Sequence, residues 1–141
     1  SKVALASRLD VSGVSVYGIN VKRDMTGKET DRAKRTDKIR VCFALSENRV
    51  AKAGKKTLYI RIIAPNGLIL TQGTTAEFKF EFNGGKGFYT EKKVVDYSNA
   101  AKEFCMDWSR PDENHLVQAG KYNVFLYAED YEMASTSFEL K

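Results

Sequence analysis

The chain contains a single histidine, which lies in the run Asp112-Glu113-Asn114-His115. A histidine and a carboxylate are two members of a Ser-His-Asp triad, and Asp, Glu and Asn oxygens also bind calcium. Here, however, the acids lie in the same turn as the histidine. The chain has no Gly-x-Ser-x-Gly elbow, and the run lacks the alternating ligand spacing of calcium loops. We therefore expect a solvated turn, with no catalytic residue and no metal ligand.

The run Gly84-Gly85-Lys86-Gly87 has the composition of a phosphate-binding loop. It lacks the Gly-x-x-x-x-Gly-Lys-Ser/Thr pattern and a helix after it, and alternating phenylalanines precede it, so we interpret it as a hairpin loop. Neither a Cys-x-x-Cys pair nor a Cys/His cluster occurs. The sequence thus predicts that the protein is not an enzyme and needs no cofactor. A hydrolase of unrecognised type is the least favoured alternative.

The chain has two cysteines, Cys42 and Cys105. Each alternates with the apolar face of its predicted strand, so the disulfide that joins the two sheets of an antibody domain is not expected. If the two strands are neighbours, the sulfurs can meet on an outer face, provided that the Cα atoms lie roughly 4.4–6.8 Å apart. We expect free thiols and keep this bridge as the alternative.

Strands must position these residues, because apolar and polar side chains alternate over short segments throughout the chain. A bulge is expected near Gly18, and the hydrophilic residues 23–37 are interpreted as a long mobile loop. About eight strands with turn signals between them, and no convincing amphipathic helix, predict an all-β fold. The predicted strands are residues 14–21, 39–46, 57–64, 78–82, 88–97, 104–108, 119–127 and 135–140.

The end of the chain indicates the type of β fold. A small residue, Gly120 and Tyr122 lead into an alternating strand, and one more strand follows, as in strands F and G of an immunoglobulin-like sandwich. Tyr122 lies where such domains place their tyrosine corner. The fold class is therefore an immunoglobulin-like or fibronectin-III-like antiparallel β-sandwich of about seven to nine strands.

The length of 141 residues, 43% of them hydrophobic, fits one domain with its own core. We predict a tail or linker over residues 1–10 and a single sandwich over residues 11–141. No apolar run of about eighteen residues and no signal peptide occur, and the first residue is a serine, so a targeting segment or anchor would lie upstream.

Two predicted strands, residues 57–64 and 119–127, place aromatic and arginine side chains opposite their core residues. These strands correspond to C and F, which are neighbours, so the side chains would share one outer face with the composition of an interface hot spot. We expect this face to bind a protein partner or a second copy of the chain, unless an insertion, the 23–37 loop or the N-terminal segment covers it. The expected contact residues are Tyr59, Arg61, Ile63, Phe125 and Tyr127.

A second surface is basic. Residues 22–56 hold twelve Lys or Arg against five acids, whereas residues 101–141 hold four against eight, so the net charge of +5 is unevenly placed. Such a cluster can bind the phosphates of nucleic acid or another anionic polymer, although no base-stacking motif accompanies it. This is the alternative function, with the candidate residues Arg32, Lys34, Arg35, Lys38, Arg40, Lys52, Lys55 and Lys56.

The chain resembles a bacterial family of uncharacterised envelope proteins in its runs KETDRAKR (28–35), KIRVCFAL (38–45), TLYIRIIAPNG (57–67) and GKY (120–122). Members of that family look like a short N-terminal membrane anchor, a coiled coil and this C-terminal domain. The resemblance implies a non-catalytic interaction or assembly module held away from a membrane, in the periplasm or cell envelope rather than the cytoplasm. It transfers no functional residue.

Overall fold

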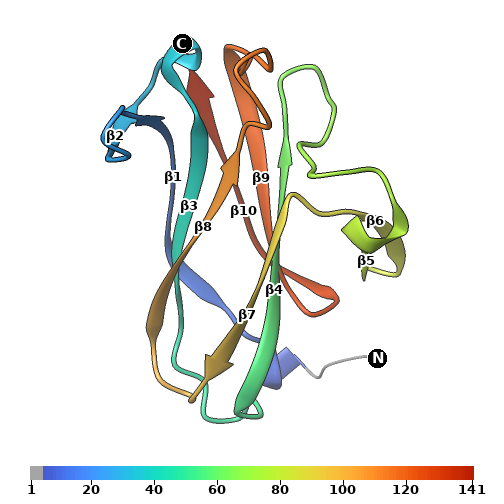
Figure 1. Ribbon diagram of the computed structural model, residues 1–141. Helices are drawn as coiled ribbons and strands as arrows, with labels where there is room; N and C mark the ends of the chain where they lie inside the picture. Colours follow the sequence, from blue (N-terminus) through green and yellow to red (C-terminus); the bar gives the residue numbers. More distant parts are fainter. Residues whose placement is uncertain (1–4) are drawn as a thin grey trace.

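The computed structural model describes residues 5–141, and their side chains from residue 6 (Figure 1). Ten strands and three short 3₁₀ turns, η1 (Leu5–Ser7), η2 (Ala33–Arg35) and η3 (Ala76–Phe78), make up the regular structure of this part of the chain. The strands are β1 (Val11–Val21), β2 (Gly27–Thr30), β3 (Lys38–Leu45), β4 (Gly54–Ile63), β5 (Lys79–Phe82), β6 (Gly85–Phe88), β7 (Glu91–Tyr97), β8 (Lys102–Ser109), β9 (Gly120–Ala128) and β10 (Tyr131–Leu140).

The strands form two four-stranded antiparallel sheets and a separate hairpin. One sheet has the order β2-β1-β3-β8, the other has the order β10-β9-β4-β7, and β5 pairs with β6 alone. The two sheets lie face to face along the length of the molecule, with the hairpin at one side (Figure 1). This is an immunoglobulin-like β-sandwich, so the predicted fold class is confirmed, with ten strands instead of seven to nine.

The core lies between the sheets and follows the alternation of the sequence. In β3 every second residue is buried, and in β4 the side chains of Leu58, Ile60 and Ile62 are almost fully buried. Met106 and Trp108 face them from β8. These alternating residues therefore hold the sandwich together by burying apolar surface.

The segment expected to be a long mobile loop is largely ordered. β2 pairs with the end of β1, from Gly18 opposite Thr30 to Val21 opposite Gly27, and Ala33 in η2 is buried. At Gly18 a Cβ atom would lie 2.8 Å from both the Thr30 carbonyl oxygen and the Thr36 hydroxyl. This glycine therefore permits the close approach of β2; the irregularity of β1 lies at residues 12–15, not near Gly18 as predicted.

Tyr122 forms the predicted tyrosine corner. Its hydroxyl donates a hydrogen bond of 2.6 Å to the backbone carbonyl of Gln118, four residues upstream, and its side chain is 1% exposed. Burial raises the pKa of Tyr122 to about 12. The bond fixes the connection between β8 and β9 to the start of β9.

The expectation of free thiols is wrong, because Cys42 and Cys105 form a disulfide. The two residues lie directly opposite each other on β3 and β8. Their Cα atoms are 4.1 Å apart, slightly closer than the usual range of roughly 4.4–6.8 Å. As predicted, both lie on the outer face of their sheet, since the residues on either side of each face the core. The neighbouring-strand alternative was therefore the correct one.

The segment before β1 packs on the sandwich. Leu9 is 4% exposed and belongs to the core, and its N–H donates to the Tyr131 hydroxyl at 2.7 Å. Packed structure thus begins within the predicted tail, of which residues 1–4 lie outside the described part of the chain. In the part that is described, no helix is long and apolar enough to span a bilayer.

Candidate binding site at one end of the sandwich

The aromatic face predicted from the sequence is assembled as expected. β4 and β9 are neighbours, with Tyr59 opposite Tyr127 and Arg61 opposite Phe125, so these side chains share the outer face of their sheet. Ile63 is opposite Asn123 at the end of the same pairing. The five predicted contact residues are therefore brought together.

The β5–β6 hairpin nevertheless covers much of this face. Phe80 of the hairpin stacks on Tyr59, with 4.0 Å between ring centroids, and meets Tyr127 edge-on at 5.2 Å. Tyr127 is 2% exposed. The insertion between β4 and β7 thus builds a second, smaller core over part of the predicted contact surface, and Tyr127 is corrected to a core residue.

Arg61 contributes to this small core. Its Nε donates a hydrogen bond of 2.8 Å to the Phe88 carbonyl, and its guanidinium lies 4.6 Å from the centroid of the Phe82 ring. Both partners belong to the hairpin. Arg61 therefore holds the hairpin on the sheet instead of offering its charge to solvent.

The predicted basic surface is divided between the two ends of the molecule. Lys38 begins β3, whereas Lys52, Lys55 and Lys56 follow its other end, and an eight-residue strand spans about 25 Å. Arg40 forms a bidentate pair with Asp107 across β3 and β8, at 2.8 and 2.9 Å. The expected single anion-binding surface is therefore not formed; only the part around η2 remains compact.

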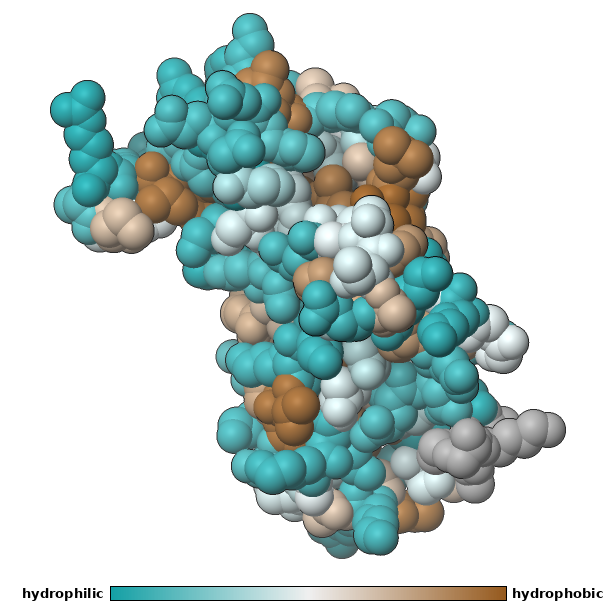
Figure 2. Space-filling view, turned by 45° about the vertical axis from the view of Figure 1, so that its right-hand side comes forward, coloured by the Kyte–Doolittle hydropathy of each residue, from teal (hydrophilic) through white to brown (hydrophobic). Residues whose placement is uncertain are grey.

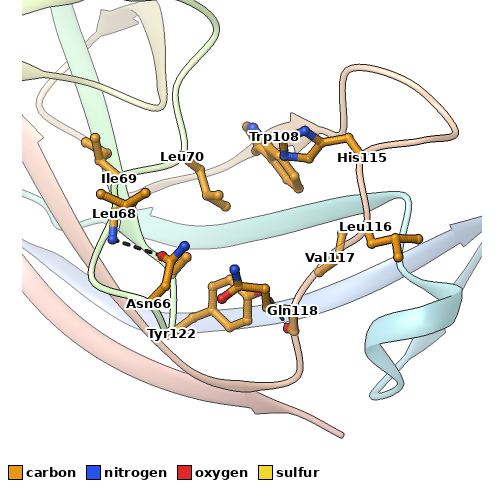
Figure 3. Close-up of a pocket in the computed structure, with 11 residues that line it drawn as sticks. Asn66, Leu68, Ile69, Leu70, Trp108, His115, Leu116, Val117, Gln118 and Tyr122 are labelled. Carbon is orange, nitrogen blue, oxygen red and sulfur yellow. Dashed lines mark hydrogen bonds between the residues drawn. The ribbon is translucent and has the colours of Figure 1, made fainter.

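A hollow opens at the end of the sandwich where residues 64–70 approach the connection between β8 and β9 (Figure 3). It has a volume of about 270 Å³. Its floor includes Trp108 and Tyr122, which are 2% and 1% exposed, and its rim includes Leu68 and Leu116, which are 67% and 80% exposed. The other lining residues are Ala64, Asn66, Ile69, Leu70, His115, Val117 and Gln118.

A tight turn after β4 positions one wall of the hollow. The Ala64 N–H donates to the Leu68 carbonyl at 2.8 Å, and the Leu68 N–H donates to the Asn66 side chain at 3.0 Å. Gly67 has a φ of +85°, which favours glycine. The turn therefore holds Leu68 on the rim.

The opposite wall is the connection between β8 and β9. His115 lies against Trp108, with 6.5 Å between ring centroids, and Tyr122 binds the Gln118 carbonyl as described above (Figure 3). The hollow is lined by no serine, cysteine or carboxylate. Among the residues that the structure describes, no group of three potential ligands could hold a metal ion.

The exposed apolar residues of the rim were not singled out in the sequence. Leu68 follows a Pro-Asn-Gly turn and Leu116 follows an acidic run, and the signal that could have found them is a leucine within a polar loop. Figure 2 shows one face of the molecule as mostly hydrophilic, with hydrophobic side chains gathered toward its upper end. Such gatherings mark interaction sites on otherwise polar proteins.

Comparison with known proteins places the chain in a family. The model of a family described as Domain of unknown function (DUF8428) matches residues 12–141. The chain belongs to this family. No curated protein matches this DUF8428 chain.

Several solved structures are similar to the DUF8428 chain. A β-glucosidase from Kluyveromyces marxianus shares 17% identity with a TM-score of 0.49, over 94% of this chain and 14% of that one. The alkylpurine DNA glycosylase AlkC from Pseudomonas fluorescens shares 12% with a TM-score of 0.48, over 94% and 30%. An immunoglobulin-like protein from Pseudomonas aeruginosa shares 13% with a TM-score of 0.42, over 98% and 100%. The chain thus spans a minor part of the first two proteins, and the comparison assigns it no ligand.

Proposed function

We propose that this DUF8428 domain is a non-catalytic protein-binding module, and that the hollow at the end of the sandwich is its contact site. The observation that supports this most is the rim: Leu68 and Leu116 are largely exposed above a floor of buried aromatic side chains. Exposed apolar side chains beside a preformed hollow are typical of sites that bury a partner's side chain.

The lining of the hollow supports a non-catalytic role. Nucleophilic catalysis needs a nucleophile within hydrogen-bond reach of a base. His115 is the only imidazole in the lining, which holds no carboxylate, and its ring lies against Trp108 instead of against a hydroxyl or thiol. Binding therefore accounts for the site better than hydrolysis does.

We also propose that the module works in the bacterial cell envelope. The disulfide between Cys42 and Cys105 supports this placement, because disulfides persist in oxidising compartments and are rare in the cytosol. The resemblance to anchored coiled-coil envelope proteins points the same way. The partner is then another envelope protein or a second copy of the chain.

Selection of peptide ligands tests the contact site. Peptides from a displayed random library are selected on the wild-type protein and then tested on the double variant Leu68→Asp/Leu116→Asp. A matched control, Val50→Asp/Val94→Asp, places two aspartates at other exposed apolar positions. Circular dichroism and thermal unfolding confirm that both variants fold.

We expect the selected peptides to lose binding to the rim variant and to keep binding to the control. Peptides that bind both variants as they bind the wild type would place the contact site elsewhere. A library that yields no enriched peptide would count against a peptide-binding function.

A further inference from the structure

A groove lies beside the hollow, on the other side of the same loop. It has a volume of about 650 Å³ and shares the wall residues Leu116, Val117 and Gln118 with the hollow. The remaining lining residues are Arg32, Ala33, Lys34, Arg35, Ala119 and Lys141. A third, smaller hollow that also contacts Leu116 and Val117 adjoins them. A bound segment could therefore contact both sites across Leu116.

The groove is basic, and of its four lining cations only Lys141 is paired within the described part of the chain, with Asp31 at 3.6 Å. Arg32, Lys34 and Arg35 are exposed, none of the lining residues is acidic, and no carboxylate within residues 6–141 forms an ion pair with these three side chains. By contrast, Arg40 and Arg110 of the same domain are paired with aspartates at 2.8 Å. The three cations are therefore free to bind an anionic partner.

The backbone that carries these cations is fixed. Lys141 donates its N–H to the Asp31 carbonyl at 2.7 Å, and Ala33 donates its N–H to the Lys141 carbonyl at 2.8 Å, so η2 is joined to the end of β10. Asn20 of β1 donates to the Arg35 carbonyl at 2.8 Å. A preorganised wall loses less entropy on binding than a mobile loop would.

The apolar part of the site favours a protein segment over a nucleic acid. Leu116 is 80% exposed between the groove and the hollow, and no aromatic side chain lines the groove. Single-stranded nucleic acids are usually held by stacking on aromatic side chains as well as by charge. An occupant with carboxylates and an aliphatic side chain matches both features of the site.

From these features we infer that the partner of this module presents an acidic segment containing a leucine-like side chain. The carboxylates lie against Arg32, Lys34 and Arg35, and the apolar side chain packs between Leu116 and Leu68 in the hollow. This inference rests on the proposed function, since it assigns a chemical class to the ligand of the same site.

The test uses a short blocked peptide in which glutamate and leucine alternate, and an equivalent peptide in which glutamine replaces glutamate. Binding to the whole protein is measured by calorimetry at low and physiological salt. The triple variant Arg32→Gln/Lys34→Gln/Arg35→Gln removes the cations of the groove. The matched control, Lys52→Gln/Lys55→Gln/Lys56→Gln, removes the same charge at the opposite end of the sandwich.

We expect the glutamate peptide to bind the wild type and the control equally, and the groove variant at least about tenfold more weakly, with a clear weakening at higher salt. The glutamine peptide should bind the wild type no more tightly than the glutamate peptide binds the groove variant. Equal binding of both peptides, or no effect of the groove variant, would overturn the inference.

Two further results separate this inference from the proposed function. If Leu68→Asp/Leu116→Asp abolishes binding of the glutamine peptide while the groove variant changes nothing, the hollow is the contact site but its ligand is not acidic. If a DNA duplex binds at physiological salt and loses affinity in the groove variant, the site recognises nucleic acid and the inference is wrong.

Discussion

The ring of Phe80 stacks on the ring of Tyr59, with 4.0 Å between the two centroids. This contact joins the β5–β6 hairpin to the outer face of β4. Phe80 is 6% exposed, and Tyr127, next to Tyr59 on β9, also packs against it. The hairpin therefore covers part of a face that the strands alone would leave as an aromatic surface.

Substituting Phe80→Ala should lower the free energy of unfolding by about 3 kcal/mol, since truncation of a buried phenylalanine typically costs 3–5 kcal/mol. It should also increase the binding of a hydrophobic dye, because Tyr59 and Tyr127 lose their cover. Urea unfolding and dye fluorescence measure the two effects. Val94→Ala, at a position 56% exposed, serves as the control and should change neither. If Phe80→Ala lowered the free energy of unfolding only as much as Val94→Ala does, the hairpin would not stabilise the fold.

Substituting Tyr122→Phe should lower the free energy of unfolding by about 1 kcal/mol, the usual contribution of one hydrogen bond. The variant keeps the aromatic ring and loses only the bond to the Gln118 carbonyl. Tyr59→Phe is the matched control, since no hydrogen bond of the Tyr59 hydroxyl is formed within the described residues. Equal urea midpoints for the two variants would contradict a stabilising tyrosine corner.

The raised pKa of Tyr122 predicts a loss of stability at high pH. Burial raises this pKa from 10.0 in the unfolded chain to about 12 in the folded one. Above about pH 10 the unfolded state therefore releases the phenolic proton first, and unfolding becomes more favourable as the pH approaches about 12. The stability difference between the wild type and Tyr122→Phe should accordingly shrink from about pH 8 to about pH 11. Parallel pH profiles of the two proteins would contradict this cause.

Reduction of the disulfide should lower the free energy of unfolding by about 2–4 kcal/mol, since the bridge joins residues 63 positions apart and limits the unfolded chain. Urea unfolding of Cys42→Ala/Cys105→Ala, compared with the oxidised wild type, measures this effect without added reductant. Thiol titration of the denatured, unreduced wild type should detect no free thiol. Two reactive thiols per chain would contradict the bridge.

Local patterns were enough to predict much of the fold. The alternation in residues 39–46 and 57–64 identified β3 and β4 and their buried faces, and Tyr122 was recognised from its neighbours alone. Local patterns do not encode which distant segments meet. The pairing of Cys42 with Cys105 depends on the register of β3 and β8. The sequence alone therefore could not decide whether the disulfide forms.

The differences in where the predicted surfaces lie have the same origin. The phenylalanines of β5 indicated a strand, but their packing against Tyr59 depends on how residues 64–90 fold back over the sheet. Leu68 and Leu116 are distant in the sequence and line the same hollow only because two connections converge there. The basic residues were grouped because they are close in sequence, although β3 carries them to opposite ends of the molecule.

Backbone amide chemical-shift mapping with the alternating glutamate–leucine peptide tests the central claim most directly. The account predicts that the perturbed amides cluster in residues 32–35, 66–70 and 115–119, at one end of the sandwich. Perturbations centred on the β5–β6 hairpin or on the outer faces of β4 and β9, or no perturbation at millimolar peptide, would contradict it.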